Sequence, residues 1–149
     1  MLRTLRLADL RPRSYAALFV AGGHGVMFDV ARDPALSLLT AQMLAARKVV
    51  AAVCHGPCFL ATARGADGRP LIEGRRVTGF TNAEEEVVRM TRLMPFSLED
   101  ELRRASGGRF EAGPPWTSHV VADGNLITGQ NPASSEAVAR KTLEALERR

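Results

Sequence analysis

The chain has 149 residues, 46% of them apolar, which is enough for one buried core, so we expect a single domain over residues 1–149. Its net charge of +4 comes mostly from scattered arginine pairs without a basic stripe interleaved with aromatics, so we expect no nucleic-acid partner. Two cysteines are too few for a disulfide framework, and no apolar run approaches membrane-spanning length. We therefore expect a cytoplasmic protein that makes no membrane contact.

In chain order, the first half alternates between strand and helix patterns. Residues 15–21 predict a strand, and residues 34–46 predict a helix because their large apolar side chains recur on or near one face. Residues 48–53 are almost continuously apolar, as expected of a parallel strand covered on both faces. Pro57 then begins a second helix that ends near Arg64. This alternation predicts an α/β layered domain.

The second half continues with shorter elements after a turn-rich loop over 65–74. The expected elements are a strand over 76–80, a helix from Glu84 capped by Asn82, a helix over 96–105, hairpin strands over 119–122 and 126–128, and a last helix from Asn131. Asp123-Gly124 supplies the hairpin turn. In the last helix, the residues spaced for burial are Ala139, Leu143 and Leu146.

The segment Cys54-His55-Gly56-Pro57 follows the buried strand directly. A strand that ends in a thiol and turns sharply into a helix lifts that thiol above the carboxyl edge of the sheet, as in the serine elbow of hydrolases. The N–H groups of the coming helix and the neighbouring imidazole favour a thiolate. Cys54 is therefore predicted to be a nucleophile on a strained turn, rather than a small buried hydrophobe.

The second cysteine, Cys58, is expected to pack inside the helix. A metal site built from Cys54, His55, Cys58 and His24 is disfavoured, because two ligands would be adjacent in sequence and only one further histidine lies nearby. We expect no metal and no cofactor.

Motifs along essentially the whole chain resemble the ThiJ/PfpI superfamily, which shares its fold with class I glutamine amidotransferases. Within it they look most like the branch of glyoxalase III and heat-shock chaperone-like proteins. The matching segments are AGGHG (21–25) with Asp29, AVCHGP (52–57), RPLIEG (69–74), VTGFTN (77–82) with Glu84-Glu85, PFSLE (95–99) and DGNLITGQNPAS (123–134).

The resemblance implies a flavodoxin-like parallel sheet sandwiched by helices, with the thiol on a nucleophile elbow. It also implies a glutathione-independent glyoxalase that acts on a small aldehyde, converting methylglyoxal to lactate, or a related deglycase that uses the same thiol. The Cys54 thiolate would add to the aldehyde carbon, and His55 would move a proton between the two carbons through an enediol. Water would then release lactate from the thioester.

The same resemblance assigns the roles of individual residues. His55 is the base and Glu85 the carboxylate that orients it, which completes a Cys-His-carboxylate set with Cys54. The backbone N–H groups of Gly23 and His55 form the oxyanion hole. His24 and Trp116 are expected to line the substrate pocket, with plain packing as the alternative for each. Beside Glu85, Glu84 and Glu86 are expected to be solvated residues of a first helical turn.

The family normally begins with roughly two further strands and a helix ahead of the part that matches residues 4–13. We therefore expect an N-terminally truncated domain without the family's first-strand glutamate, which exchanges protons beside the cysteine. The resemblance leaves room for a homodimer.

Two hypotheses from other classes stay open. One is a stress chaperone or redox-sensing protein in which Cys54 is oxidised rather than catalytic, and the other is an inactive fragment. Glutaminase chemistry is set aside, because it uses a histidine and an acid two residues apart, far downstream of the cysteine. Here His119 is followed by Val120 and Val121.

Overall fold

The computed structural model describes residues 4–148, so residues 1–3 and 149 lie outside the described part. One sheet has the strand order β1-β2-β4-β3. Its strands are β1 (Ala17–Val20), β2 (Val49–Val53), β3 (Val120–Asp123) and β4 (Leu126–Gly129). β1, β2 and β4 run parallel, and β3 pairs antiparallel with β4 through the predicted Asp123-Gly124 turn. The predicted parallel-dominated sheet and its hairpin are confirmed.

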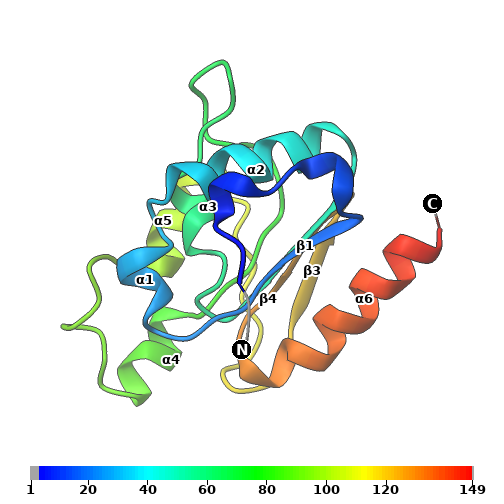
Figure 1. The fold of residues 1–149 in the computed structure, drawn as a ribbon. Coiled ribbons are helices and arrows are strands. Elements are labelled where there is room, and N and C mark those ends of the chain that lie inside the picture. The colour runs from blue at the N-terminus through cyan, green and yellow to red at the C-terminus, as the bar shows by residue number, and fades with distance from the viewer. Residues whose placement is uncertain (1–3, 149) are drawn as a thin grey trace.

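The central strand β2 explains how the layers form. All five of its residues are buried, because alternate side chains enter two different apolar clusters. Val50 and Ala52 face the cluster under α2 (Pro34–Ala45), whereas Val49, Ala51 and Val53 face α6 (Ser135–Glu147). The two helices therefore cover opposite faces of the sheet (Figure 1), as a continuously apolar parallel strand requires.

The remaining α-helices lie on the α2 side of the sheet or at the carboxyl ends of its strands. They are α1 (Val26–Asp29), α3 (Cys58–Thr62), α4 (Asn82–Val87) and α5 (Leu98–Ala105). α3 packs against both α2 and α5, and the buried side chains of these three helices belong to one apolar cluster. Among the described residues, no helix combines the length and apolar character needed to cross a membrane.

The prediction of a strand over residues 76–80 is wrong. This run makes only one isolated bridge, between Val77 and Phe110. The backbone N–H of Arg76 instead donates to the Asp123 carboxylate, and that of Thr78 donates to the Thr128 hydroxyl. Because side chains satisfy these N–H groups, the run lies against the sheet without joining its ladder.

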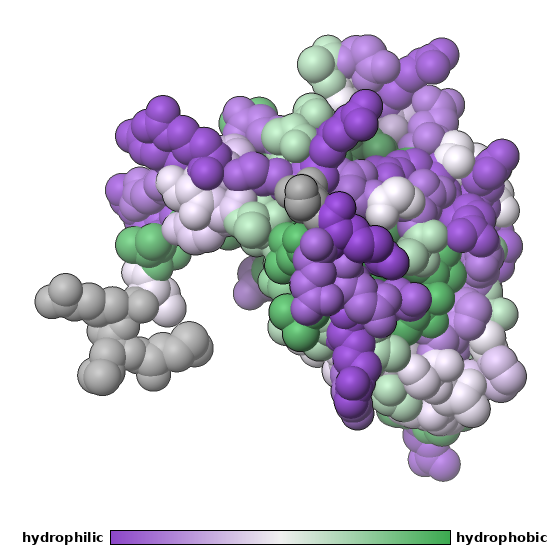
Figure 2. Space-filling model, turned by 90° about the vertical axis from the view of Figure 1, so that its right-hand side faces the viewer, coloured by the Kyte–Doolittle hydropathy of each residue, from purple (hydrophilic) through white to green (hydrophobic). Residues whose placement is uncertain are grey.

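The buried face predicted for the last helix is only partly right. Leu146 packs against the apolar cluster on this side of the sheet, but Ala139 is exposed and Leu143 is 60% exposed, and the buried residues of α6 are Val138 and Thr142. The face is set by a close approach at Gly129 of β4, where an added Cβ would lie 2.5 Å from a methyl group of Val138. The outer side of this helix carries charged residues, and Figure 2 shows a largely hydrophilic surface with hydrophobic patches between the polar groups.

Candidate active site

Cys54 directly follows β2 and has a left-handed backbone, with φ of 62°. Its N–H donates to the carbonyl of Gly129, which continues the β2–β4 ladder, and the N–H of Gly56 then bonds back to Val53. After this turn, α3 begins at Cys58. A non-glycine residue in this conformation costs about 1–2 kcal/mol, so the surrounding structure holds Cys54 in a strained position at the end of the strand.

The loop after β1 comes so close to this turn that one of its residues has no room for a side chain. An added Cβ at Gly22 would lie 2.6 Å from the carbonyl oxygen of Val53 and 2.7 Å from Cβ of Cys54. Gly23, next in the chain, has φ of 112°, and its backbone, like that of His55, lies close enough to the Cys54 thiol to lower the pKa of that thiol. The two residues expected to form the oxyanion hole are therefore both placed at the sulfur.

Replacing Gly22 with alanine is expected to destabilise the fold by about 1–3 kcal/mol, because backbone atoms on the facing turn must move to admit the methyl group. The matched control is Gly25→Ala in the same loop, where the added Cβ has no atom within 4 Å. Urea denaturation followed by circular dichroism measures both. Equal stability of the two variants would contradict the close approach.

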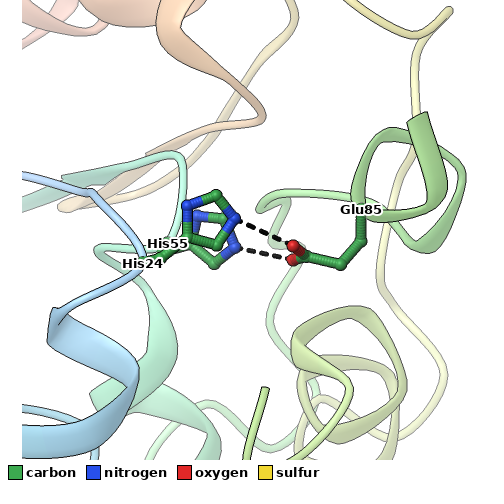
Figure 3. Close-up of side chains that lie close together, drawn as sticks. All are labelled: His24, His55 and Glu85. Atoms are coloured by element: carbon green, nitrogen blue, oxygen red, sulfur yellow. Dashed lines mark hydrogen bonds and ion pairs between the residues drawn. The ribbon is translucent and has the colours of Figure 1, made fainter. Parts of the chain in front are cut away.

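The Glu85 carboxylate joins two imidazoles that are 31 residues apart in the sequence (Figure 3). His55 Nε2 lies 2.8 Å from Glu85 Oε2, and His24 Nε2 lies 2.8 Å from Glu85 Oε1. The two rings are 4.2 Å apart between centroids. His55 is fully buried and Glu85 is 8% exposed, whereas the His24 side chain is 32% exposed. The structure thus brings Cys54, His55 and Glu85 together and adds His24 to them.

These contacts define how His55 is oriented. A carboxylate carries no proton, so Nε2 of His55 donates to Glu85, and Nδ1 of a neutral ring is left as an acceptor. Nδ1 lies 3.4 Å from the Cys54 sulfur, on the opposite side of the ring from Glu85. Phe80 packs against the same ring at 4.4 Å between centroids. Burial lowers the pKa of His55 below its ordinary value, although the Glu85 hydrogen bond acts in the opposite direction.

The Cys54 thiol is not the ready thiolate that its position at the turn predicts. Burial raises the pKa of Cys54 above its ordinary value, and the hydrogen bonds from the backbones of His55 and Gly23 only partly oppose this effect. The resting thiol therefore needs a base to remove its proton. The neutral Nδ1 of His55 is placed to accept it.

The two cysteines differ in exposure and in acidity. Cys54 is half-buried, whereas Cys58 is fully buried, and burial raises the pKa of Cys58 to about 12. The Cys58 thiol donates a hydrogen bond to the carbonyl of Val26, which fits the packing role expected for it.

Iodoacetamide is expected to alkylate Cys54 much faster than Cys58 near neutral pH, because only Cys54 combines access with an adjacent base. Peptide mass spectrometry of partially labelled native protein measures the ratio. Equal labelling, or faster labelling of Cys58, would contradict this arrangement.

The structural role of Glu84 is not predicted from the sequence. This residue was expected to be solvated, yet it is fully buried, whereas Glu86 is exposed as expected. One carboxylate oxygen accepts from the backbone N–H and hydroxyl of Thr81, which forms a capping box at the start of α4, so the cap is Thr81 and not Asn82. The other oxygen accepts from the backbone N–H of Trp116 and from the side chains of Gln130 and Asn131.

Five donors thus gather on Glu84, and they tie the start of α4 to the loop around Trp116 and to the segment after β4. Burial by itself raises the pKa of Glu84, but the hydrogen bonds from Trp116, Asn131 and Thr81 outweigh burial and lower the pKa below its ordinary value. The available signal in the sequence is the spacing Thr81-x-x-Glu84, which is that of a capping box.

Glu84 is expected to make stability depend on pH. A carboxylate with a lowered folded-state pKa contributes stability above its unfolded pKa, and that contribution is lost as pH falls through the folded pKa. The urea midpoint of the wild type should therefore decrease as the pH falls below about 4.5. In Glu84→Gln the midpoint should no longer depend on pH in this range, and the free energy of unfolding at neutral pH should be lower by about 3 kcal/mol. The exposed control Glu86→Gln should change stability by less than about 0.5 kcal/mol. Equal loss in both variants would contradict the buried network.

A cavity of about 570 Å³ opens onto the sulfur. Its lining is mostly apolar or aromatic and includes Phe19, Phe80 and Trp116, together with His24 and the Gly22-Gly23 backbone. The Trp116 ring packs edge-on against Phe80 at 5.6 Å, and its backbone is left-handed with φ of 62°. His24 and Trp116 therefore both lie at the cavity. A larger groove of about 910 Å³ between α2 and residues 62–75 contains neither cysteine nor histidine, so the chemistry favours the smaller one.

Ligand-type atoms of His24, His55 and Glu85 lie within 4.8 Å of one another, which is a spacing that a divalent metal can use. This donor set differs from the cysteine-containing set considered from the sequence. A metal here would have to displace both imidazole–carboxylate hydrogen bonds, because each Nε2 donates its proton to Glu85.

Comparisons with known proteins identify the relatives of this chain. Residues 1–145 match the DJ-1/PfpI family. "Glutathione-independent glyoxalase HSP31" of Saccharomyces cerevisiae is 34% identical over 93% of this chain and 60% of its own length. "Glyoxalase 3" of Candida albicans is 32% identical over 95% of this chain and 62% of its own length.

Solved structures agree in fold. The crystal structure of glyoxalase III from Candida albicans has a TM-score of 0.85 at 30% identity, and covers 93% of this chain and 60% of that one. The Rapid Encystment Protein of Francisella tularensis has a TM-score of 0.91 at 35% identity, and covers 95% of this chain and 63% of that one. The chain spans about three fifths of the length of these relatives.

Proposed function

The chain belongs to the DJ-1/PfpI family, and we propose that it acts as a cysteine-dependent glyoxalase that converts methylglyoxal to lactate without glutathione. The observation that carries this proposal is the Cys54 thiol placed against His55 Nδ1 beside a largely apolar cavity. Relatives more than 30% identical that are named as glyoxalases support this choice among thiol reactions.

In the first step, His55 Nδ1 accepts the thiol proton as the sulfur adds to the aldehyde carbon, C1. The S–C1 bond forms while the π bond of the C1 carbonyl breaks, and its electron pair moves to the oxygen O1. In this proposal the backbone N–H groups of Gly23 and His55, which act on the resting thiol to lower its pKa, stabilise the oxyanion. His55 then returns its proton to O1, which gives a neutral hemithioacetal. Because the sulfur belongs to the protein, the reaction needs no glutathione.

The hemithioacetal next isomerises through an enediol. C1 loses its proton while O2, the ketone oxygen, gains one. C2 then gains a proton while O1 loses its own, which leaves a lactoyl thioester on Cys54. Water attacks the thioester carbonyl, the C1–S bond breaks, and the sulfur regains its proton. Methylglyoxal and one water become lactate and one proton, so the sequence requires no oxidant or reductant.

The test is lactate formation by the purified chain from methylglyoxal in buffer without glutathione, followed by proton NMR. We expect a rate proportional to protein concentration and unchanged by EDTA, because no proposed step uses a metal. Heat-denatured protein is the control for the slow reaction of methylglyoxal with exposed side chains. Lactate that forms no faster than with denatured protein would overturn the proposal.

A further inference from the structure

The enediol step needs two groups that handle protons on neighbouring substrate atoms, one at C1 and one at the ketone oxygen O2. Among the described residues that line the cavity, only Cys54, His24 and His55 have side chains that titrate. The Cys54 sulfur is bonded to the substrate at this stage. The two imidazoles are therefore the remaining candidates for the two proton transfers.

We infer that His24 is the second proton-transfer group of the site, acting at O2 of the hemithioacetal while His55 acts at C1. The inference rests on the proposed glyoxalase function and goes beyond it by assigning chemistry to a residue that sequence alone could place only as pocket lining or as packing. It is carried by three observations: the bond from His24 to Glu85, the partial exposure of its ring in the cavity, and its distance from His55.

The contact with Glu85 determines which nitrogen of His24 can transfer a proton to O2. Nε2 donates to Oε1 of Glu85, so a neutral ring has an unprotonated Nδ1. No described residue hydrogen-bonds to this Nδ1, which contrasts with His55, whose Nδ1 faces the sulfur. The ring is 32% exposed and lines the cavity, so it can exchange protons with solvent between turnovers.

The spacing of the rings suits a substrate with two adjacent reacting carbons. The ring centroids are 4.2 Å apart, and both rings bond to the same carboxylate, one to each oxygen. Glu85 can therefore stabilise a positive charge on either imidazole, while repulsion between the rings disfavours charge on both at once. One ring gives a proton as the other takes one, and the pair carries a single charge throughout.

In the isomerisation, His55 removes the C1 proton while protonated His24 donates a proton to O2. The C1–H electron pair becomes the C1–C2 double bond, and the electrons of the C2–O2 π bond form the new O2–H bond. In the second half the roles are exchanged: protonated His55 supplies a proton to C2, and neutral His24 removes the proton from O1. Every proton taken by one ring is balanced by one given by the other, so the pair returns to its starting charge.

The test compares His24→Gln with His24→Ala. The glutamine amide can still donate a hydrogen bond to Glu85 but cannot carry a proton between atoms. We expect kcat of His24→Gln on methylglyoxal to fall by about 10²–10⁴-fold with little change in KM, while alkylation of Cys54 by iodoacetamide is unchanged. Added imidazole should restore part of the activity of His24→Ala, because it can occupy the vacated, partly exposed site. His119→Gln, which removes the histidine outside the cavity, is the matched control and should remain active.

If His24 only positioned Glu85, the activities of the two His24 variants would follow a different pattern. Wild-type activity in His24→Gln, or no response of His24→Ala to imidazole, would overturn the inference and leave the glyoxalase proposal standing. A wild-type chain that makes no lactate would overturn the proposed function, and the inference with it.

Discussion

Replacing Glu85 with glutamine is expected to lower kcat/KM for methylglyoxal by about 10²–10⁴-fold. Glutamine has nearly the same shape, but it offers one acceptor and one donor where the carboxylate accepts from both imidazoles. If the amide nitrogen faces His55, that ring must carry its proton on Nδ1, next to the sulfur, and cannot act as the base. If it faces His24, His55 keeps its tautomer but loses the negative charge that stabilises its protonated form.

The control for Glu85→Gln is Glu86→Gln, one residue further on the same helix and exposed to solvent. Steady-state kinetics of both variants, with circular dichroism to confirm folding, measure the effect. Equal activity of Glu85→Gln and Glu86→Gln would show that the carboxylate at position 85 does not orient the base.

Replacing Cys54 with alanine is expected to abolish lactate formation above the level of denatured protein. In the proposed mechanism the thiol forms the bond to C1 from which every later step starts, so its loss would remove the whole reaction path and not a single stabilising contact. The matched control is Cys58→Ala, four residues away at a fully buried position outside the cavity, which should retain activity if it folds. Lactate production by Cys54→Ala at a substantial fraction of the wild-type rate would exclude covalent catalysis by this thiol.

The sequence predicts the part of the site that local pattern determines. The buried strand β2 follows from its continuous apolar run, and the turn at Cys54 follows from the abrupt change to Cys-His-Gly-Pro. The motif resemblance placed Glu85 near His55 although the two are 30 residues apart. In each case either a single segment or a family motif contains the whole signal.

What the sequence did not predict depends on contacts between distant segments. The spacing from Thr81 marks Glu84 as a capping-box residue, but its burial also depends on donors from Trp116, Gln130 and Asn131, which are distant in the sequence. The buried face of α6 includes Val138 and not Ala139 or Leu143, because Val138 packs closely against Gly129 of β4 and this contact sets how the helix is rotated.

The carboxylate that His24 and His55 share and the raised pKa of the Cys54 thiol also depend on contacts between distant segments. No spacing rule joins His24 to Glu85, which lie 61 residues apart and meet only because the loop after β1 and helix α4 reach the same end of the sheet. The turn and the adjacent imidazole predict an acidic thiol, but burial of the sulfur acts more strongly and raises its pKa. Burial is a property of the assembled fold, so the local motif alone could not predict the sign of the shift.

The most direct test of the central claim, that the Cys54 thiol bonds to the substrate carbon, is a single-turnover experiment with the protein in excess over ¹³C-labelled methylglyoxal. Samples are quenched in acid at successive times, and the peptide containing Cys54 is analysed by mass spectrometry. The label is expected to appear on the Cys54 sulfur before lactate accumulates and to disappear as labelled lactate forms, with none on Cys58. Complete conversion to lactate with Cys54 unlabelled at every time would contradict the account.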